Sequence, residues 1–600
     1  MKEKIYKLIT SLVAPVLRQL PFFVIIFLIL AERAIRGIHS QLVEPSMYTN
    51  AYDLSGQVAL AFLWAYIFTL IVDVSGKKWV KICLYIFGIA LFAICKFLWL
   101  NFGMTINPHA ITLLVETNSR EASGFVSSFV LASGSLLTYL YTAILVVVTV
   151  VAEIVYHRRY KDVKTVLNTG AKKCAAALFT LFLAYGLHAA CCYFRIFSYE
   201  TNDQLNNVER LDVVYPSDPI SALAQSCYGL HLSSNETRQA LQMTANLKPS
   251  TVEAQDSLDV VLIIGESYNK WHAGIYGYPL NTTPHMSEEM QKGNLIAFSD
   301  AVTSQSLTSP SMKNMLCCNS FSHGEKWFQS PYFPAIFKSA GYDVFFWDNQ
   351  KFVQEFSQFT FSINSFIYNK DLERMSYTQG NTEDYNLDFP IVYNYVHTPR
   401  KMGKYNLVMF HLMGQHSPPK ARYPKVPLFE HFTADSIIRS EKYITTEKKQ
   451  LIAQYDNSTL YNDHVVNAIF NIFRNRNAIV VYLSDHGEET YDYKDATWRT
   501  YHGLEKGWVK HIHNVPFVVW CSDIYMQNNP DKVEAIRNAA QRPFAIDNLC
   551  HMMFNIAQIK TPYYNAERDV ISPAFKKHKR LVEGKDDYVI GDYDKILNEK

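Results

Sequence analysis

The stretch Val260–Ser267, VVLIIGES, predicts a buried strand that ends at a carboxylate. A second stretch, Ile479–Glu488, repeats the pattern as IVVYLSDHGE. In each, an apolar run stops at Gly or Ser and leads into Glu266 or into Asp485 and His486. Open α/β sheets build their sites at the carboxyl ends of parallel strands. If the two strands are neighbours, these side chains form an oxygen and nitrogen pocket suited to zinc or manganese, and the chain is a metalloenzyme.

The hydrophobic residues, 49% of the 600-residue chain, are concentrated before about residue 200. Five apolar segments there are long enough to cross a bilayer. Their succession, with charged breaks between them, argues against buried core helices and against a cleavable signal peptide. We therefore expect residues 1–200 to form a transmembrane domain of five helices, at Leu20–Ile35, Val58–Val74, Ile82–Leu100, Leu136–Val155 and Ala175–Phe194.

Basic residues between these segments predict the orientation in the membrane. They gather at the N-terminus, in the second break and in the fourth break, which are expected to be cytoplasmic. An odd number of spans then places the chain after about residue 200 on the outer side. The net charge is only +2. We expect membrane lipids as partners, no nucleic acid, and a monomer.

The rest of the chain has an α/β pattern. Residues 201–255 are polar and predict a linker with amphipathic helices near Asp218–Leu230 and Glu236–Asn246. Residues 256–575 alternate strand-like runs with helical stretches, which predicts a domain with a mainly parallel central sheet. Residues 576–600 are charged and predict a surface tail. The expected strands are Val260–Ile264, Val344–Trp347, Leu407–Met413, Ile479–Leu483 and Val515–Trp520.

Other reactive side chains lie near these strand ends. His411 and His416 follow the third strand, His502 comes sixteen residues after His486, and His511 precedes the last strand. Several histidines at one sheet edge are more often part of a site than structural. Residues 302–312 are dense in hydroxyls that could supply a nucleophile, but they also fit a turn and helix cap. Nothing local favours one hydroxyl over another.

Taken together, these motifs resemble the phosphoethanolamine transferases of Gram-negative bacteria, which are membrane members of the alkaline phosphatase/sulfatase superfamily. The resemblance covers the whole chain, including five spans before an exported domain. It implies an alkaline phosphatase/sulfatase-like catalytic domain. The segments that carry it are Ile263–Ser267, His272, Tyr276–Pro284, His411–His416, Arg422–Pro424, Tyr455–Ser458, Ser484–Glu488 and His502-Gly503.

The resemblance implies a role for each matching position. Zinc would be held by Glu266, Thr308, Asp485 and His486, with Thr308 as the nucleophile. One zinc site is expected and a second is allowed. His416 and His502, with His511, would bind the phosphoryl oxygens, and the first two could instead hold the second zinc. Thr117 and Glu121 match a pair near the donor headgroup, although a short charged external loop explains them equally well.

The implied reaction is transfer of phosphoethanolamine from phosphatidylethanolamine to a lipopolysaccharide acceptor, either lipid A or a core sugar. It would proceed through a phosphoethanolamine–threonine intermediate, at the periplasmic side of the inner membrane. One alternative is a glycerophosphate transferase similar to lipoteichoic acid synthase, which would use manganese. Another is a membrane-bound sulfatase or phosphodiesterase, although Ser309-Pro310 lacks the arginine that sulfatases place two residues later. A transporter or receptor with a metal-free domain is the non-enzymatic alternative.

Overall fold

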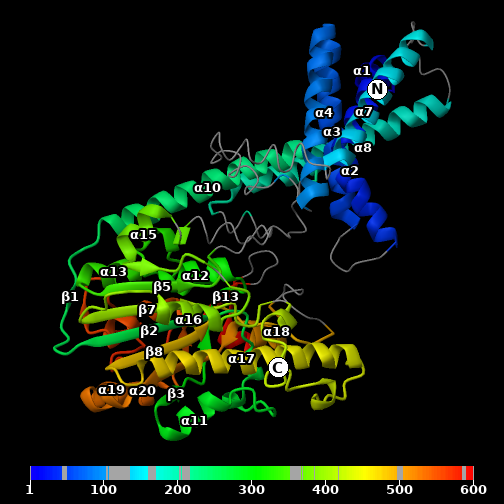
Figure 1. Cartoon of the computed structure of the whole chain (residues 1–600). Coiled ribbons are helices and arrows are strands. Elements are labelled where there is room, and N and C mark those ends of the chain that lie inside the picture. Colours follow the sequence, from blue (N-terminus) through cyan, green and yellow to red (C-terminus); the bar gives the residue numbers. More distant parts are fainter. Residues whose placement is uncertain are drawn as a thin grey trace. The chain divides into compact units, whose positions relative to one another are not determined.

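The computed structural model divides into two compact units, Met1–Ser233 and Ser234–Lys600 (Figure 1). It describes residues 2–43, 51–102, 106, 135–159, 170–201, 205, 217–351, 366–367, 369–383, 385–416, 418–495, 504–583 and 590–598. The expected domain bounds at residues 200, 255 and 575 stay predictions.

The first unit is helical. Its helices are α1 (Lys2–Arg18), α2 (Leu20–Val43), α3 (Ala51–Ser75), α4 (Lys78–Phe102), α7 (Leu136–Arg159) and α8 (Gly170–Phe194). Within the described ranges, four helices are long and apolar enough to cross a membrane, at Leu54–Ser75, Lys78–Leu100, Leu136–Arg159 and Lys172–Ser198. They correspond to the last four predicted spans.

The first predicted span differs from the other four. It passes the same test only as a bent pair, Lys7–Arg18 with Leu20–Arg36, whose two parts meet at 85°. Pro21 stands at the second residue of α2, where its missing N–H is tolerated at a helix start but cannot continue α1. The described residues therefore contain four spans, or five if the bent pair counts as one.

One helix replaces the two that were expected in the linker. Helix α10 (Pro219–Ala245) runs without a break for 27 residues. Asp218 caps its first turn, because its Oδ1 accepts hydrogen bonds from the backbone N–H groups of Ile220 (3.1 Å) and Ser221 (2.8 Å).

The second unit is built on a seven-stranded sheet in the order β3-β10-β8-β2-β7-β5-β6. Each adjacent pair from β8 to β6 is parallel, whereas β10 is antiparallel to both of its neighbours. The sheet is thus mixed, with a parallel majority as predicted. The strands are β2 (Leu258–Gly265), β3 (Leu295–Ala297), β5 (Asp343–Asp348), β6 (Gln379–Gly380), β7 (Tyr405–His411), β8 (Ala478–Ser484) and β10 (Phe517–Cys521).

The predicted strand Val515–Trp520 is split in the structure. Pro516 separates β9 (Asn514–Val515), which belongs to a small sheet with β4 (Ala301–Val302) and β11 (Phe544–Ala545), from β10 in the large sheet. Proline has no N–H to donate to a ladder, so it falls between the two sheets. The other described strands form two short antiparallel pairs. Strand β1 (Thr251–Val252) pairs with β12 (Ile559–Lys560), and β13 (Leu581–Glu583) pairs with β14 (Ile590–Asp592).

Helices cover both faces of the large sheet. Along β2, Val260, Leu262 and Ile264 enter one buried cluster, while Val261 and Ile263 enter another. This alternation explains why the strand is a continuous apolar run. Figure 1 shows α12 (Thr308–Leu316) and α13 (Phe333–Ala340) on one side and α11 (Pro284–Lys292) and α17 (Thr446–Phe473) on the other. The remaining helices are α15 (Lys370–Ser376), α16 (Phe389–His397), α18 (Lys506–His513), α19 (Asp523–Asn528), α20 (Pro530–Ala539), α21 (Leu549–Ile556) and α22 (Tyr593–Asn598).

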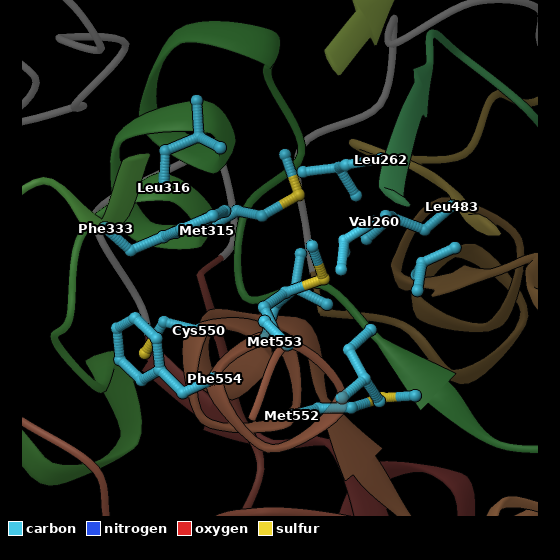
Figure 2. Packing of buried hydrophobic residues seen from close by; sticks show 14 of the residues in the cluster. Val260, Leu262, Met315, Leu316, Phe333, Leu483, Cys550, Met552, Met553 and Phe554 are labelled. Carbon is cyan, nitrogen blue, oxygen red and sulfur yellow. The ribbon is translucent and has the colours of Figure 1, made fainter. Parts of the chain in front are cut away.

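The core positions helix α12, on which Thr308 is the first residue. Met315 and Leu316 at the far end of α12 belong to the same buried cluster as Val260 and Leu262 of β2 (Figure 2). Met552, Met553 and Phe554 of α21 are also in this cluster. Because the helix is clamped between the sheet and α21, its N-terminus has a set position above the sheet edge.

The described residues of the C-terminal segment, 576–583 and 590–598, pack more closely against the domain than the expected surface tail. Val582 and Tyr593 are buried with Val302 and Val509. Arg580 is 2% exposed and its guanidinium pairs with carboxylates of Asp300 and Asp594. The few apolar residues of this charged segment therefore suffice to attach it to the domain.

Candidate metal centre

Strands β2 and β8 are direct neighbours, and their register aligns Gly265 with Ser484. Both strands therefore end at the same edge of the sheet, and the residues that follow them meet there. Glu266, Asp485 and His486 are all completely buried. Each offers a ligand atom within 4.8 Å of the others, so the three could hold a metal ion.

The imidazole of His486 is oriented for metal binding. Its Nδ1 lies 2.8 Å from the carbonyl oxygen of Gly487, which can only accept, so Nδ1 carries the proton. The unprotonated Nε2 lies 3.3 Å from a carboxylate oxygen of Glu266 and 3.3 Å from Oδ2 of Asp485. Lone pairs from all three residues thus converge where a cation would bind them.

Asp485 also fits a metal ligand. Its Oδ1 accepts hydrogen bonds from the N–H groups of Ser267 (3.2 Å) and His486 (2.7 Å), which fix the carboxylate. Its Oδ2 is buried without a hydrogen-bond partner in the described part of the chain. Burial, followed by the nearby Glu266 carboxylate, raises the pKa of Asp485 well above its usual value. A divalent cation would satisfy the free oxygen and offset both negative charges.

Two hydroxyls contact this group: that of Ser267, which donates to Oε1 of Glu266 at 2.6 Å, and that of Thr308. Oγ1 of Thr308 donates to Oε2 of Glu266 at 2.9 Å and lies 3.3 Å from Nε2 of His486. Thr308 occupies the first position of α12, where the helix dipole favours negative charge. In the same segment, the hydroxyl of Ser311 donates to the backbone oxygen of Asp485 at 2.6 Å and so ties α12 to the loop after β8.

The loop after β2 packs closely against the loop after β7. Ser267 adopts a left-handed backbone with φ of 56°. Gly414, at φ of 48°, lies over Glu266, and a Cβ at Gly414 would be 2.6 Å from the Glu266 carbonyl oxygen. Two backbone segments thus pack directly against each other beside the metal group, and glycine is required at residue 414.

Gln350 and His411 border the centre, and the sequence did not single out Gln350. The Gln350 amide nitrogen lies 3.4 Å from Oε2 of Glu266 and 3.1 Å from Nε2 of His411. Burial lowers the pKa of His411, but the Asp348 carboxylate 3.0 Å from its Nδ1 raises it above the usual value. One feature of the sequence could have indicated Gln350: the predicted strand Val344–Trp347 leads directly into the polar residues 348–350.

The predicted substrate-side residues fall in different places. Among described residues, the group of possible ligands that contains Glu266 does not include His416, which lies on the loop after β7. His511 belongs to a second group with Glu489 and Asp492. His502, Thr117 and Glu121 lie outside the described residues.

The second group differs from the first in its charge balance. Oδ2 of Asp492 lies 3.1 Å from Nε2 of His272, and Oδ1 lies 3.5 Å from the Arg439 guanidinium. Burial alone would lower the pKa of His272, but the carboxylates of Asp492 and Asp456 raise it to about 10. Burial lowers the pKa of His511 to about 4, so its imidazole is neutral at neutral pH. Nearby cations already offset the charge of Asp492, whereas the first group contains none.

Comparisons with known proteins agree with the fold and with the motifs. A model of the sulfatase family matches residues 259–559. Phosphoethanolamine transferase EptC of Escherichia coli (strain K12) is 25% identical over 557 residues, which cover 90% of this chain and 91% of that protein. Phosphoethanolamine transferase CptA of Salmonella typhimurium (strain LT2) is 24% identical over 560 residues, with the same coverage of 90% and 91%.

A solved structure shows the same order of parts. The integral membrane protein lipooligosaccharide phosphoethanolamine transferase A (EptA) from Neisseria meningitidis superposes with a TM-score of 0.50 at 15% identity, over 92% of this chain and 97% of that chain. This likeness confirms the predicted fold class, a helical membrane part followed by an α/β domain. The curated matches confirm the resemblance that the sequence motifs predicted.

Proposed function

Because the chain belongs to the sulfatase family, and because curated relatives along 90% of its length are phosphoethanolamine transferases, we propose that it transfers phosphoethanolamine from phosphatidylethanolamine to a lipopolysaccharide acceptor. Lipid A and a core sugar are the two candidate acceptors. One relative, from Salmonella typhimurium (strain LT2), is a Kdo(2)-lipid A phosphoethanolamine 7''-transferase. Thr308 is the nucleophile in this proposal.

One observation carries the proposal. The hydroxyl of Thr308 lies at hydrogen-bonding distance from both Glu266 and the unprotonated nitrogen of His486. A zinc ion bound by Glu266, Asp485, His486 and Thr308 would supply the Lewis acid that makes a threonine alkoxide available at neutral pH. The orphaned Oδ2 of Asp485 and the Nε2 of His486, which lies 3.3 Å from the Glu266 and Asp485 carboxylates, fit such an ion.

The residues of the chain divide the work of two half-reactions. Thr308 attacks the phosphorus of the donor, the bond to diacylglycerol breaks, and a phosphoethanolamine–threonine ester remains. Glu266 accepts the hydrogen bond of Thr308 and holds its oxygen in position. The N-terminus of α12 faces the negative charge that develops at residue 308. An acceptor hydroxyl or phosphate then attacks the ester and regenerates Thr308, which predicts ping-pong kinetics.

The proposed location follows from the helical unit. With the bent pair counted as one span, five apolar segments would anchor the chain in the bacterial inner membrane, with the N-terminus in the cytoplasm and the catalytic unit in the periplasm. Both lipids would then reach the enzyme at the outer leaflet, and neither need be extracted into water. His416, His502 and His511 keep their proposed roles in binding the phosphoryl group, and Thr117 and Glu121 keep theirs beside the donor headgroup.

Mass spectrometry of envelope lipids tests the proposal. Cells that express the chain are expected to gain one phosphoethanolamine unit on lipid A or core sugar, and the position of the gain identifies the acceptor. Thr308→Ala should abolish the gain at unchanged expression, while Thr308→Ser, which keeps a hydroxyl, should retain part of it. The mass of the intact protein, incubated with donor alone, should rise by one phosphoethanolamine unit only in chains with a hydroxyl at residue 308.

A matched variant controls for general damage to this segment. Ser306 is in the same hydroxyl-rich stretch and is partly exposed like Thr308, so Ser306→Ala should leave the modification unchanged. Full modification by Thr308→Ala would move the nucleophile to another hydroxyl. A released glycerophosphate group in place of phosphoethanolamine would favour the glycerophosphate transferase alternative.

A further inference from the structure

Two cysteine side chains meet near the far end of α12, the helix that begins at Thr308. Cys318 lies two residues beyond the end of α12, and Cys550 is the second residue of α21. Their thiols form a hydrogen bond with each other. Cys550 is completely buried in the cluster that Figure 2 shows, and Cys318 is partly buried against the same cluster. Both cysteines are reduced in the structure.

The backbone around the two cysteines holds them in this contact. The N–H of Cys318 donates to the carbonyl oxygen of Pro331 at 2.9 Å. Three residues later, the N–H of Phe321 donates to Oδ2 of Asp547 at 2.7 Å, and Asp547 lies three residues before Cys550. The chain after Cys318 is thus attached to the chain before Cys550 by a bond that does not involve sulfur. Sulfur atoms that already touch need only a small shift to reach the disulfide length of about 2.05 Å.

The adjacent Cys317 has a different setting. Its backbone is extended, with φ of −99° and ψ of 159°, and it forms a bridge with Tyr332. Successive side chains of an extended segment point to opposite sides, so the thiols of Cys317 and Cys318 leave the backbone in opposite directions. The thiol that forms the hydrogen bond with Cys550 is that of Cys318. Cys318 is therefore the partner that is placed for a covalent bond.

The two thiols differ in their readiness to ionise. Burial alone would raise the pKa of Cys550, but the Cys318 thiol and the positive charge of His551 lower it to about 5. Burial raises the pKa of Cys318 well above its usual value. A thiolate is the form that attacks a disulfide. Cys550 therefore carries the reactive sulfur, while Cys318, which is the more exposed of the two, is the one that an outside molecule can reach.

We propose that Cys318 and Cys550 are oxidised to a disulfide by thiol–disulfide exchange. The oxidant is a disulfide, either of a small thiol or of another protein. Cys318 attacks it, forms a mixed disulfide and releases the first thiol. The Cys550 thiolate then attacks Sγ of Cys318, the new S–S bond forms, and the second thiol leaves. Two cysteines are oxidised, one external disulfide is reduced, and the two cysteine protons end on the released thiols.

The supply of this oxidant in cells depends on an oxidising compartment. That part of the inference rests on the proposed periplasmic location, whereas the pairing rests on the contact between the two thiols. The bond would fasten the end of α12 to α21 and close a long loop between residues 318 and 550. Cross-links that close long loops restrict the unfolded chain most. For the unit Ser234–Lys600, the usual stabilisation by a disulfide corresponds to a Tm rise of about 3–6 °C.

Peptide mapping of the purified full-length chain in detergent tests the pairing. The chain is reduced, oxidised with glutathione disulfide, alkylated in denaturant and digested with trypsin. Cys317 and Cys318 share the peptide 314–326, and Cys550 lies in the peptide 538–560. We expect the two peptides to be linked with the loss of two hydrogens, and to separate on treatment with dithiothreitol. Alkylation of both Cys318 and Cys550 after oxidation, or glutathione that remains on Cys318, would overturn the proposal.

Cys317→Ala is the matched control, because it removes the adjacent thiol and leaves the pair. This variant should keep the link, and oxidation should raise its Tm by the same amount as that of the unmodified chain. Cys318→Ser, at a partly exposed residue, should lose both the link and the Tm rise. The opposite result, in which Cys317→Ala loses the link and Cys318→Ser keeps it, would assign the bond to Cys317 and refute the inference.

The same mapping on chain taken directly from cells separates this inference from the proposed function. Thiols are trapped by acid and alkylated before purification. The link should be present whether or not the envelope lipids gain phosphoethanolamine, because it does not depend on Thr308. A link that glutathione disulfide forms in the purified chain, but that is missing in cells, would support the pairing and contradict the proposed periplasmic location.

Discussion

Replacing Asp485 by asparagine should have opposite effects on the metal-free and the metal-bound protein. Asparagine keeps a side-chain oxygen that can accept the two hydrogen bonds that backbone N–H groups donate to Oδ1 of Asp485. It removes the negative charge at Oδ2, which is buried near the carboxylate of Glu266 and has no hydrogen-bond partner in the described residues. Without metal, the variant should be more stable than the unmodified chain at neutral pH, because the repulsion between the two acids is gone.

With zinc, the order should reverse. Free zinc at about one hundred times its dissociation constant stabilises a folded protein by about 2.7 kcal/mol. For a unit that spans Ser234–Lys600, an unfolding entropy of about 2.1 cal/mol/K per residue converts this into a Tm rise of roughly 3–4 °C. If the loss of Asp485 weakens zinc binding about 100-fold, the same zinc concentration stabilises the variant by only about 0.4 kcal/mol.

The measurement is thermal unfolding of the full-length chain in detergent, after chelation and after zinc is restored, with elemental analysis of bound zinc. Asp463→Asn is the control, because Asp463 is also buried and accepts two backbone N–H groups, from His285 and Met286. Its zinc response should be unchanged. A full zinc shift in Asp485→Asn would remove Asp485 from the ligand set. A metal-free Asp485→Asn variant less stable than the unmodified chain would refute the repulsion argument.

Three further predictions concern stability. Met315→Ala should lower the free energy of unfolding by about 2–5 kcal/mol because it leaves a cavity under α12, whereas Met290→Ala, at a residue 40% exposed, should change it little; denaturant titration compares them. Gly487→Ala should prevent stable folding, since its Cβ would overlap the His511 carbonyl group, and a soluble variant with normal unfolding would contradict this. Burial lowers the pKa of His513 to about 4, so the folded state binds fewer protons than the unfolded state between about pH 4 and 6.5. The stability that this side chain contributes above that window should fall by roughly 3 kcal/mol on acidification through it. His513→Asn should reduce the slope and leave the part due to His511, whose pKa burial also lowers to about 4.

The meeting of Glu266 with Asp485 and His486 could be predicted because it depends on a local pattern. Each residue directly follows an apolar strand, and adjacent parallel strands end at one edge. The selection of Thr308 from its neighbours could not be predicted from the segment itself, because it depends on how α12 packs on β2 and α21. Only the resemblance to a family indicated that residue.

Gln350 and the surroundings of His511 depend on longer-range geometry. Gln350 reaches Glu266 only because β5 lies two strands from β2. The assignment of His511 to a separate group with Asp492 follows from contacts with His272 and Arg439 that no spacing indicates. The antiparallel direction of β10, and the assignment of β9 and β10 to different sheets on either side of Pro516, depend on which strands lie beside them.

The pairing of β2 with β8 joins residues that are 219 positions apart in the chain, such as Asp259 and Ala478. Closing so long a loop requires most of the domain to assemble first. A partly synthesised or unfolded chain therefore has no preformed cage for a cation, and an ion at this site would be acquired late, in the compartment where the domain completes its folding. The identity of that ion would then depend on what the compartment supplies, in addition to the preference of the ligands.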